Sequence, residues 1–282
     1  METSIDCRLF VYNLVKLDRK EQTIVFYLNK IVFLFLIFIS FFLSPAVFSD
    51  YDQDGTYFTS FLGSSISLPS NLKIKLDDQS SYNNHSKWQG RSFEDSPYYS
   101  LRFDKIRNHR GWGVEWMHHK IYLANPKHPV ESFSISDGFN ILYLNRVLTN
   151  NKLTVRPGFG LVFSHMDVKI KDRERFYLKG GNGGAYLSGV SVQGSMEKWI
   201  YETERHFLNL ETKLTVSYVK PPVSSNPDEY AEIYNIAIHF VFGFGSKPIR
   251  SDDATAMDRL YYWGLPTAHH FLLGQDKLGF FK

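Results

Sequence analysis

Apolar and polar residues alternate with a period of two along most of the chain after about residue 50, and this pattern constrains the fold more than any other feature. In HFLNLETKLTVSYV, Leu208, Leu210 and Leu214 fall on one face. Glu211 and Lys213 fall on the other face. A helix would mix the two groups, so the pattern predicts a β-strand. Seven further segments alternate to varying degrees: TYFTSFLGSS, PYYSLRFDK, GWGVEWMHHKIYLAN, SFSISDGFNILYLN, LTVRPGFGLVFSH, AYLSGVSVQGSMEKW and EIYNIAIHFVFGF.

The connections between these eight strands alternate between long and short. RNHRG, TNNK and ETER are short, whereas the other connections are medium or long, beginning with about Ser65 to Phe93. Outer-membrane barrels have this arrangement, with short periplasmic turns and longer extracellular loops. We therefore predict an all-β, eight-stranded, antiparallel up-and-down outer-membrane β-barrel. A soluble barrel or sandwich, with its apolar face inside, is the alternative.

The N-terminal segment indicates export. A short apolar run, IVFLFLIFISFFL, follows Lys30 and leads into small residues, which is typical of a secretory signal peptide cleaved after Ser49. A membrane anchor is the alternative, but polar residues and a proline interrupt a run already shorter than the ~20 residues that a spanning helix needs. We expect an N-terminal extension and signal peptide over 1–49, the barrel over 50–245, and a periplasmic or poorly ordered tail over 246–282.

Composition excludes several classes of function. The net charge is +3, and acids and bases are interspersed, so no basic face indicates nucleic-acid binding. The single cysteine, Cys7, lies in the segment expected to be removed. The exported chain would then have no disulfide, no thiol nucleophile and no lipoprotein cysteine. We expect a monomer in the outer membrane, assembled by the barrel-insertion machinery, with membrane lipid and lipopolysaccharide as partners.

The interior of an eight-stranded barrel is filled by side chains rather than left as a wide pore. Buried charges must pair, so the polar faces predict an internal ionic network. A narrow ion path or a ligand cavity is the alternative. The side chains expected in this network are Arg102, Arg156, Glu197, Glu211, Lys213 and His239.

A second group of polar residues is expected at the extracellular rim. If the chain enters from the periplasm, the third strand runs outward, the fourth returns and the fifth runs outward again. A lumenal Glu115 favours an inward His119, but a bulge would exchange it with His118. The candidate catalytic residues at this rim are His118, His119, Ser134, Asp137 and His165, and the candidate substrate-binding residues are Lys120, Tyr122 and Tyr98.

FEDSPYYSLRFDK, WGVEWMHHKIY, SDGFNILYLN, RPGFGLVFSH and GGAYLSGVSVQ resemble successive segments of small bacterial outer-membrane β-barrels of the opacity-protein type. They look most similar to a branch with a PYYG-like strand, an H-x-K-x-Y strand end and a GxNxL-like strand. Members of that branch are described as lipid A oxidases, which convert the proximal glucosamine of lipid A to an aminogluconate. This chain departs from the pattern at Ser100, where glycine is expected, and by continuing past Phe244.

The resemblance implies an enzyme acting on lipid A, with His118 or His119 as base or metal ligand and Lys120 binding phosphate. Oxidation of a sugar would need a redox metal or another cofactor; which one is unknown, and imidazole with carboxylate is a ligand set for a divalent metal. The alternative is a non-catalytic surface barrel that binds a ligand, a host factor or lipopolysaccharide through its long loops. A small-solute channel is a third hypothesis, against which the crowded charged lumen argues.

Overall fold

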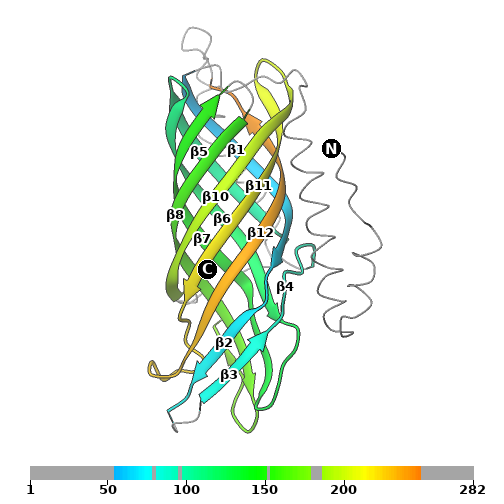
Figure 1. The fold of residues 1–282 in the computed structure, drawn as a ribbon, viewed down its shortest axis with the longest axis vertical. Helices are drawn as coiled ribbons and strands as arrows, with labels where there is room; N and C mark the ends of the chain where they lie inside the picture. Colours follow the sequence, from blue (N-terminus) through cyan, green and yellow to red (C-terminus); the bar gives the residue numbers. More distant parts are fainter. Residues whose placement is uncertain (1–53, 78–80, 95–96, 151–152, 179–185, 249–282) are drawn as a thin grey trace, which may run out of the picture. The chain divides into compact units, whose positions relative to one another are not determined.

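The computed structural model describes residues 54–77, 81–94, 97–150, 153–178 and 186–248, in which every regular element is a β-strand (Figure 1). No helix in these ranges is long and apolar enough to cross a membrane. The expected signal peptide and the tail lie outside the described residues, apart from the first residues of the tail. The strands are β1 (Gly55–Ser67), β2 (Ser70–Lys75), β3 (Ser81–Ser86), β4 (Trp88–Gln89), β5 (Tyr99–Arg107), β6 (Arg110–Leu123), β7 (Val130–Asn150), β8 (Leu153–Ile170), β9 (Phe176–Tyr177), β10 (Tyr186–Glu202), β11 (His206–Val219) and β12 (Tyr230–Ser246).

Eight of these strands form a closed antiparallel barrel, as predicted. They pair in the order β1, β5, β6, β7, β8, β10, β11 and β12, and β1 pairs with β12 to close the ring. Short turns join β5 to β6 and β10 to β11 at one end, which is the upper end in Figure 1. Between β5 and β6, Asn108 and His109 have positive φ angles of 49° and 62°, as a two-residue hairpin turn requires. The longer connections gather at the opposite end, called here the loop end.

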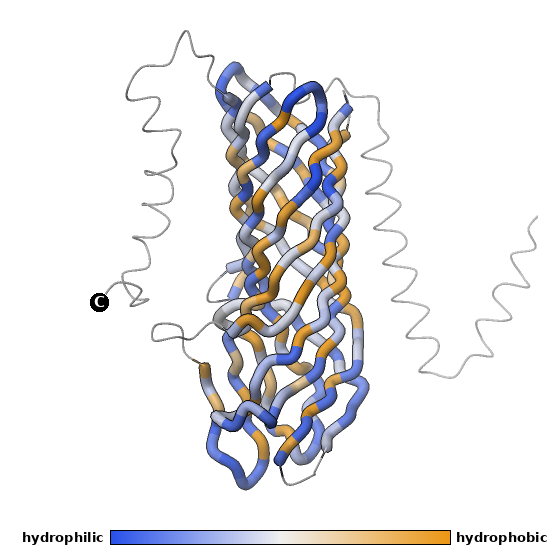
Figure 2. Tube along the Cα trace, turned by 90° about the vertical axis from the view of Figure 1, so that its left-hand side faces the viewer, coloured by the Kyte–Doolittle hydropathy of each residue, from blue (hydrophilic) through white to orange (hydrophobic). Residues whose placement is uncertain are grey.

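The wall of the barrel is apolar on the outside. Each of the eight strands exposes at least one large apolar side chain: Leu62, Phe103, Val114, Leu144, Phe159, Val192, Leu214 and Phe242. Their exposed fractions lie between 45% and 55%. Figure 2 shows hydrophobic residues along the wall between hydrophilic turns at the upper end and hydrophilic loop tips at the lower end. An apolar outer band of this kind suits lipid and not water.

The interior changes character along the barrel axis. A buried apolar cluster that includes Trp199 and Phe207 lies nearest the short turns, the middle of the lumen is charged, and the loop end is apolar, with Leu72, Ile135, Met166 and Ile233 all fully buried. The outer face at the loop end is polar, since Lys73 and its neighbours on β2 and β3 are exposed there. The loop end therefore has the polarity of a water-soluble protein, and the wall of the barrel between the loop end and the short turns has the opposite polarity.

Part of the loop end was not predicted. The segment from about Ser65 to Phe93 was expected to be a connection, but it contains the β2–β3 hairpin, which pairs through β2 with the first residues of β12. In Figure 1 this hairpin lies at the bottom of the molecule, beyond the wall of the barrel. Short β4 then pairs with the end of β6, so the sheet continues past the closed ring.

Two irregularities mark the level at which the polarity changes. The pairing of β6 with β7 shifts register between His119 and Ile121, and that of β7 with β8 shifts between Ile135 and Phe139. Gly138, within the second bulge, has a φ of +136°, which L side chains rarely adopt. The apolar face of SFSISDGFNILY was expected to face lipid but lies inside, because these residues cross from the lumen into the apolar core of the loop end.

Candidate functional site

The charged lumen is a connected ionic network, defined here as Arg102, Asp104, Glu115, Arg156, Glu197, Glu211 and Lys213. Arg102 Nη1 lies 3.0 Å from Glu197 Oε2, and Arg102 Nη2 lies 2.7 Å from Glu211 Oε1. Arg102 also bonds Glu115 at 3.2 Å. On the other side, Arg156 Nη2 lies 2.9 Å from Asp104 Oδ2, and its Nη1 lies 2.9 Å from Glu197 Oε2.

Every side chain of the ionic network is buried, and neutral polar groups complete it. Lys213 Nζ bonds Glu115, and Ser100 Oγ donates to the same carboxylate at 2.5 Å. Gln193 Nε2 and Asn145 Nδ2 each lie 3.2 Å from Glu115 Oε2. Since paired guanidinium and carboxylate groups fill this part of the lumen and apolar side chains fill the next, the structure favours a closed barrel over an open pore.

The two neighbouring histidines of β6 point in opposite directions. His119 follows Glu115 and Met117 into the lumen, where its ring lies 4.7 Å from Phe139 and 5.3 Å from His239, measured between centroids. His118 belongs to the outward face. Its ring stacks on Tyr99 at 5.0 Å, and its Nδ1 lies 2.7 Å from Asn140 Oδ1.

Lys120 and Tyr122 also lie on the outward side of the rim. Lys120 Nζ donates to the backbone carbonyl of Glu94, in the segment that connects β4 to β5. Tyr122 is opposite Gln89 in the pairing of β4 with β6. The guanidinium of Arg91 lies over the Tyr122 ring, 4.3 Å from its centroid. Tyr98, in contrast, lies inside the barrel, with its ring 5.7 Å from that of His239.

The remaining catalytic candidates lie further around the rim. Ser134 is paired with Tyr122 on one side and with Asp167 on the other. The bulge that contains Asp137 is opposite His165 on β8, which follows from the shift in pairing between Ile135 and Phe139. Ser134, His118 and His165 therefore belong to the outward face of their strands, although all three are buried with exposed fractions of 8%, 4% and 8%, whereas His119 faces the lumen.

The structure thus brings the rim candidates to one end of the barrel but divides them between its two surfaces. Among the described residues, no three His, Cys, Asp or Glu side chains are grouped so as to hold a metal ion. A nucleophile, a base and an orienting group within hydrogen-bond reach would be needed for acid–base or acyl-transfer chemistry. The side chain of Asp137 lies outside what the structure describes. The hydrogen bonds given above for the other rim candidates do not connect them into such a set, so the catalytic roles stay predictions.

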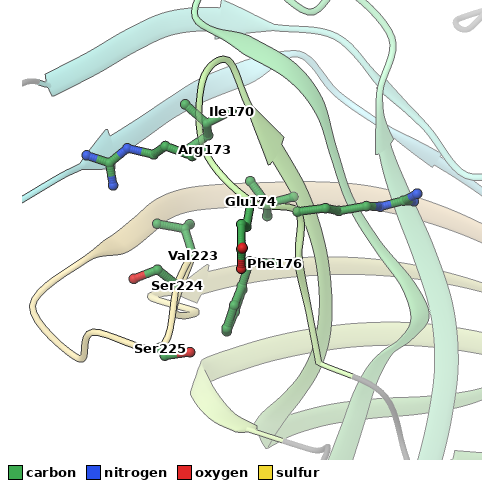
Figure 3. A pocket seen from close by; sticks show the side chains of 9 residues that line it. Ile170, Arg173, Glu174, Phe176, Val223, Ser224 and Ser225 are labelled. Atoms are coloured by element: carbon green, nitrogen blue, oxygen red, sulfur yellow. The ribbon is translucent and has the colours of Figure 1, made fainter.

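Two adjoining hollows lie at the loop end, between the β8–β10 connection and the β11–β12 loop. Their volumes are about 340 Å³ and 480 Å³, and Phe176, Ser224 and Ser225 line both. Figure 3 shows Phe176 and Glu174 on one side of the first hollow, with Val223, Ser224 and Ser225 on the other. The second is lined further by Leu178, Tyr186, Lys220, Pro222, Pro227 and Tyr230. We call these two spaces the loop hollow.

Sequence reasoning did not single out the loop hollow. Its residues come from two loops that are separate in the sequence, and neither loop alternates or carries a recognised motif. The one signal was composition, because KPPVSSNPDEY combines prolines and serines with an aromatic residue. That composition indicates an ordered loop but does not identify the loop against which it packs.

Ion pairs set the charge around the loop hollow. Arg173 Nη1 lies 2.7 Å from Glu229 Oε1, Arg175 bonds Asp167, and Lys220 Nζ lies 3.0 Å from Glu232 Oε1. Burial acts to raise the pKa of the Glu229 carboxyl. Hydrogen bonds from the Asp77 amide at 3.0 Å, from Ser224 and from Arg173 outweigh burial and hold that pKa below its ordinary value. Glu229 therefore connects the β2–β3 hairpin to both loops of the hollow.

Comparisons with known proteins identify similar solved structures only. No family model and no curated protein matches the chain. Among solved structures, AlkL in lipid bilayers is 9% identical with a TM-score of 0.41, covering 75% of this chain and 97% of its own. OprG of Pseudomonas aeruginosa is 11% identical with a TM-score of 0.36, covering 70% and 98%. Neisserial surface protein A is 10% identical with a TM-score of 0.34, covering 69% and 98%.

These values are too low to carry an argument about this chain. Its own features are more informative: a closed ring of eight antiparallel strands, short turns at one end and long connections at the other. The outward faces are apolar and the lumen is charged, which is the opposite of a soluble barrel. The strand order, the connections and the inverted surface together identify the chain as a β-barrel of the outer membrane.

Proposed function

We propose that this protein is a non-catalytic surface barrel that binds carbohydrate at the loop hollow. The observation that carries the proposal is the contrast between a lumen closed by the ionic network and hollows of about 340 and 480 Å³ at the loop end. Ligand sites are concave and mostly apolar, with a few polar groups that fix orientation. The loop hollow has this composition, and loops held by a rigid barrel are a common place for binding.

The chemistry of the lining favours a sugar over a free anion. Each cation at the hollow already has a carboxylate partner, so none of the pairs Arg173–Glu229, Arg175–Asp167 and Lys220–Glu232 offers an uncompensated positive charge. The aromatic rings of Phe176 and Tyr230 provide flat apolar faces, on which the C–H face of a pyranose packs. The hydroxyls of the serines, with paired guanidinium and carboxylate groups, match the mixed donors and acceptors of sugar hydroxyls.

The experiment is a binding titration with the folded full-length protein and its variants. Phe176→Ala removes a ring that lines both hollows, and Tyr177→Ala is the matched control because Tyr177 is the next residue, is 44% exposed and does not line them. We expect the first variant to lose at least about tenfold in affinity, equivalent to about 1.4 kcal/mol, and the second to change less than about twofold.

Two ligand arms separate the sources of the sugar. One arm uses core oligosaccharide released from lipopolysaccharide, and the other uses free host-type glycans on an array. Binding in either arm that Phe176→Ala weakens and Tyr177→Ala preserves supports the proposal and names the source. Absence of sugar binding by the folded unsubstituted protein, or equal losses in both variants, contradicts it.

Modification of lipid A is the second candidate function. The observation in its favour is that His118, Lys120, Ser134 and His165 gather on the outward faces of neighbouring strands at one level of the barrel, buried just beneath its surface. Lipid headgroups are expected at this level. Mass spectrometry of lipid A from cells with and without the gene tests it. Gain of one oxygen or loss of an acyl chain, abolished by His118→Ala, would support an enzyme. Identical spectra with a folded barrel would exclude modification of lipid A.

A further inference from the structure

Three polar aromatic side chains meet inside the barrel at the level where its interior changes from charged to apolar. Tyr98 immediately precedes β5, His119 lies on β6 and His239 lies on β12, so two strands and the segment before a third contribute one residue each. All three residues are buried, with exposed fractions of 1%, 1% and 0%. We call them the imidazole cluster.

The two imidazole rings are close but are not bonded to each other. Their centroids are 5.3 Å apart and their planes are nearly perpendicular, at 86°. His239 Nε2 lies 2.9 Å from Thr215 Oγ1. Among the described residues, His239 Nδ1, both ring nitrogens of His119 and the hydroxyl of Tyr98 have no hydrogen-bond partner.

Four unsatisfied polar atoms in one small buried region require an explanation, because buried polar groups are almost always paired. Imidazole nitrogen is a preferred ligand of zinc and copper, with a bond of about 2.0 Å to zinc. Two imidazoles on one tetrahedral ion at that distance have ring centroids about 5 Å apart. The observed separation of 5.3 Å matches this geometry.

Thr215 completes an arrangement typical of metal-binding histidines. A ligating imidazole usually bonds a protein oxygen through its other nitrogen, which fixes the tautomer and the orientation of the ring. The contact between His239 Nε2 and Thr215 Oγ1 leaves Nδ1 as the free donor atom. The phenol of Tyr98, next to His239, is a third donor atom of the kind that such ions accept.

The surrounding charge accommodates a cation. The ionic network contains three cationic side chains, Arg102, Arg156 and Lys213, and four carboxylates, Asp104, Glu115, Glu197 and Glu211. If all seven are charged, their sum is three minus four, which is −1. Lys213 is directly opposite His239 in the sheet, and its ammonium is held by Glu115. On the other side of the cluster, Phe139 and the apolar core limit access of water.

We propose that His119 and His239 bind a single divalent first-row transition-metal ion inside the barrel, with the hydroxyl of Tyr98 as a further donor. The site is independent of the carbohydrate site proposed above, because it uses lumenal residues that do not line the loop hollow. It is also distinct from the outward rim, where His118 lies.

The test uses Cu²⁺ and Zn²⁺, each alone, with the full-length protein refolded in detergent. His269→Asn and His270→Asn form the background, because the adjacent histidines of the tail would add a second site. Metal is present during refolding, excess is removed by gel filtration, and bound metal is counted by atomic emission. We expect one ion per chain and, for copper, electron paramagnetic resonance coupling to two nitrogens.

Matched variants separate binding from structure. His119→Gln and His239→Gln should each lower bound metal at least tenfold, whereas His118→Gln, the outward neighbour, should leave it unchanged. Heat-modifiable gel mobility reports whether each barrel is folded. Tyr98→Phe removes only a hydroxyl, and it should shift the copper absorption spectrum even if a histidine variant does not fold. No bound metal in the folded background protein, or equal binding by His118→Gln and a folded His119→Gln, would overturn the proposal.

Discussion

The same sheet forms two regions with opposite polarity. Towards the short turns, Arg102 and its partners are buried inside while residues such as Leu144 are 55% exposed outside. At the loop end, Leu72 and Ile233 are buried inside while Lys73 and Asn83 face outward into solvent. The surroundings, lipid for one region and water for the other, therefore decide which face of a strand is apolar.

The change between the two regions is local. It occurs at the bulges of β6 and β7, within a few residues of His119 and Gly138. Each bulge inserts extra residues into one strand and so shifts its pairing with the neighbouring strand. The outer surface of the membrane is therefore expected at this level. The two regions should therefore respond oppositely to the same kind of change.

The largest effect is expected from Arg102→Met. Arg102 bonds Glu115, Glu197 and Glu211, so its removal takes one cationic partner from each of three buried carboxylates. Removing one partner from a buried ion pair lowers the free energy of unfolding by about 3–5 kcal/mol. Urea unfolding in lipid vesicles measures this loss of stability. Arg91→Met, at the partly exposed rim, is the control. A loss below about 1 kcal/mol would show that the ionic network does not stabilise the barrel.

A smaller loss of stability is expected when a charge is placed on the outer face, and it should differ between the barrel wall and the loop end. Leu144→Arg places a charge in the middle of the apolar band and should cost about 2–4 kcal/mol. Asn83→Arg places the same charge on the outer face of β3, where water replaces lipid, and should change stability by less than about 0.5 kcal/mol. The same vesicle assay applies to both. Equal costs for the two variants would contradict the division into two regions.

The smallest effect concerns the pH dependence of the loop end. Because the pKa of Glu229 is lowered by folding, its contribution to stability is complete above the unfolded-state value of about 4.3 and is lost as pH falls through the lower folded value. Hydrogen exchange of the Asp77 amide, which donates to Glu229, should lose protection over that range. Glu229→Gln should lower protection at neutral pH and remove its pH dependence. An unchanged pH profile in this variant would assign the effect to another group.

Much of the barrel could be predicted because lipid imposes a simple pattern. The eight strands, their order and the charged lumen follow from alternation and loop length, and the inward direction of His119 follows from its phase with Glu115. The β2–β3 hairpin was missed, although Leu72 and Ile74 alternate with Lys73 and Lys75. Its second strand, SYNNHS, is too polar to signal a strand by itself.

The candidate sites were harder to predict because they depend on contacts between distant segments. The imidazole cluster joins residues of β6 and β12, and His239 was expected only as part of the ionic network. The loop hollow forms where Phe176 and Ser224 meet, nearly fifty residues apart in the sequence. Alternation gives the direction of a side chain, but it does not show which side chain of another strand it meets.

Labelling of single cysteines on intact cells with a membrane-impermeant maleimide, in a Cys7→Ser background, would show which parts of the barrel are outside the cell. The positions are Ser132→Cys at the loop end, Leu144→Cys in the apolar band and Thr203→Cys in the short turn after β10. We predict rapid labelling of the first and no labelling of the other two until the cells are opened, when the third reacts. Labelling of Leu144→Cys, or of Thr203→Cys but not Ser132→Cys, on intact cells would contradict the placement of this barrel in the membrane.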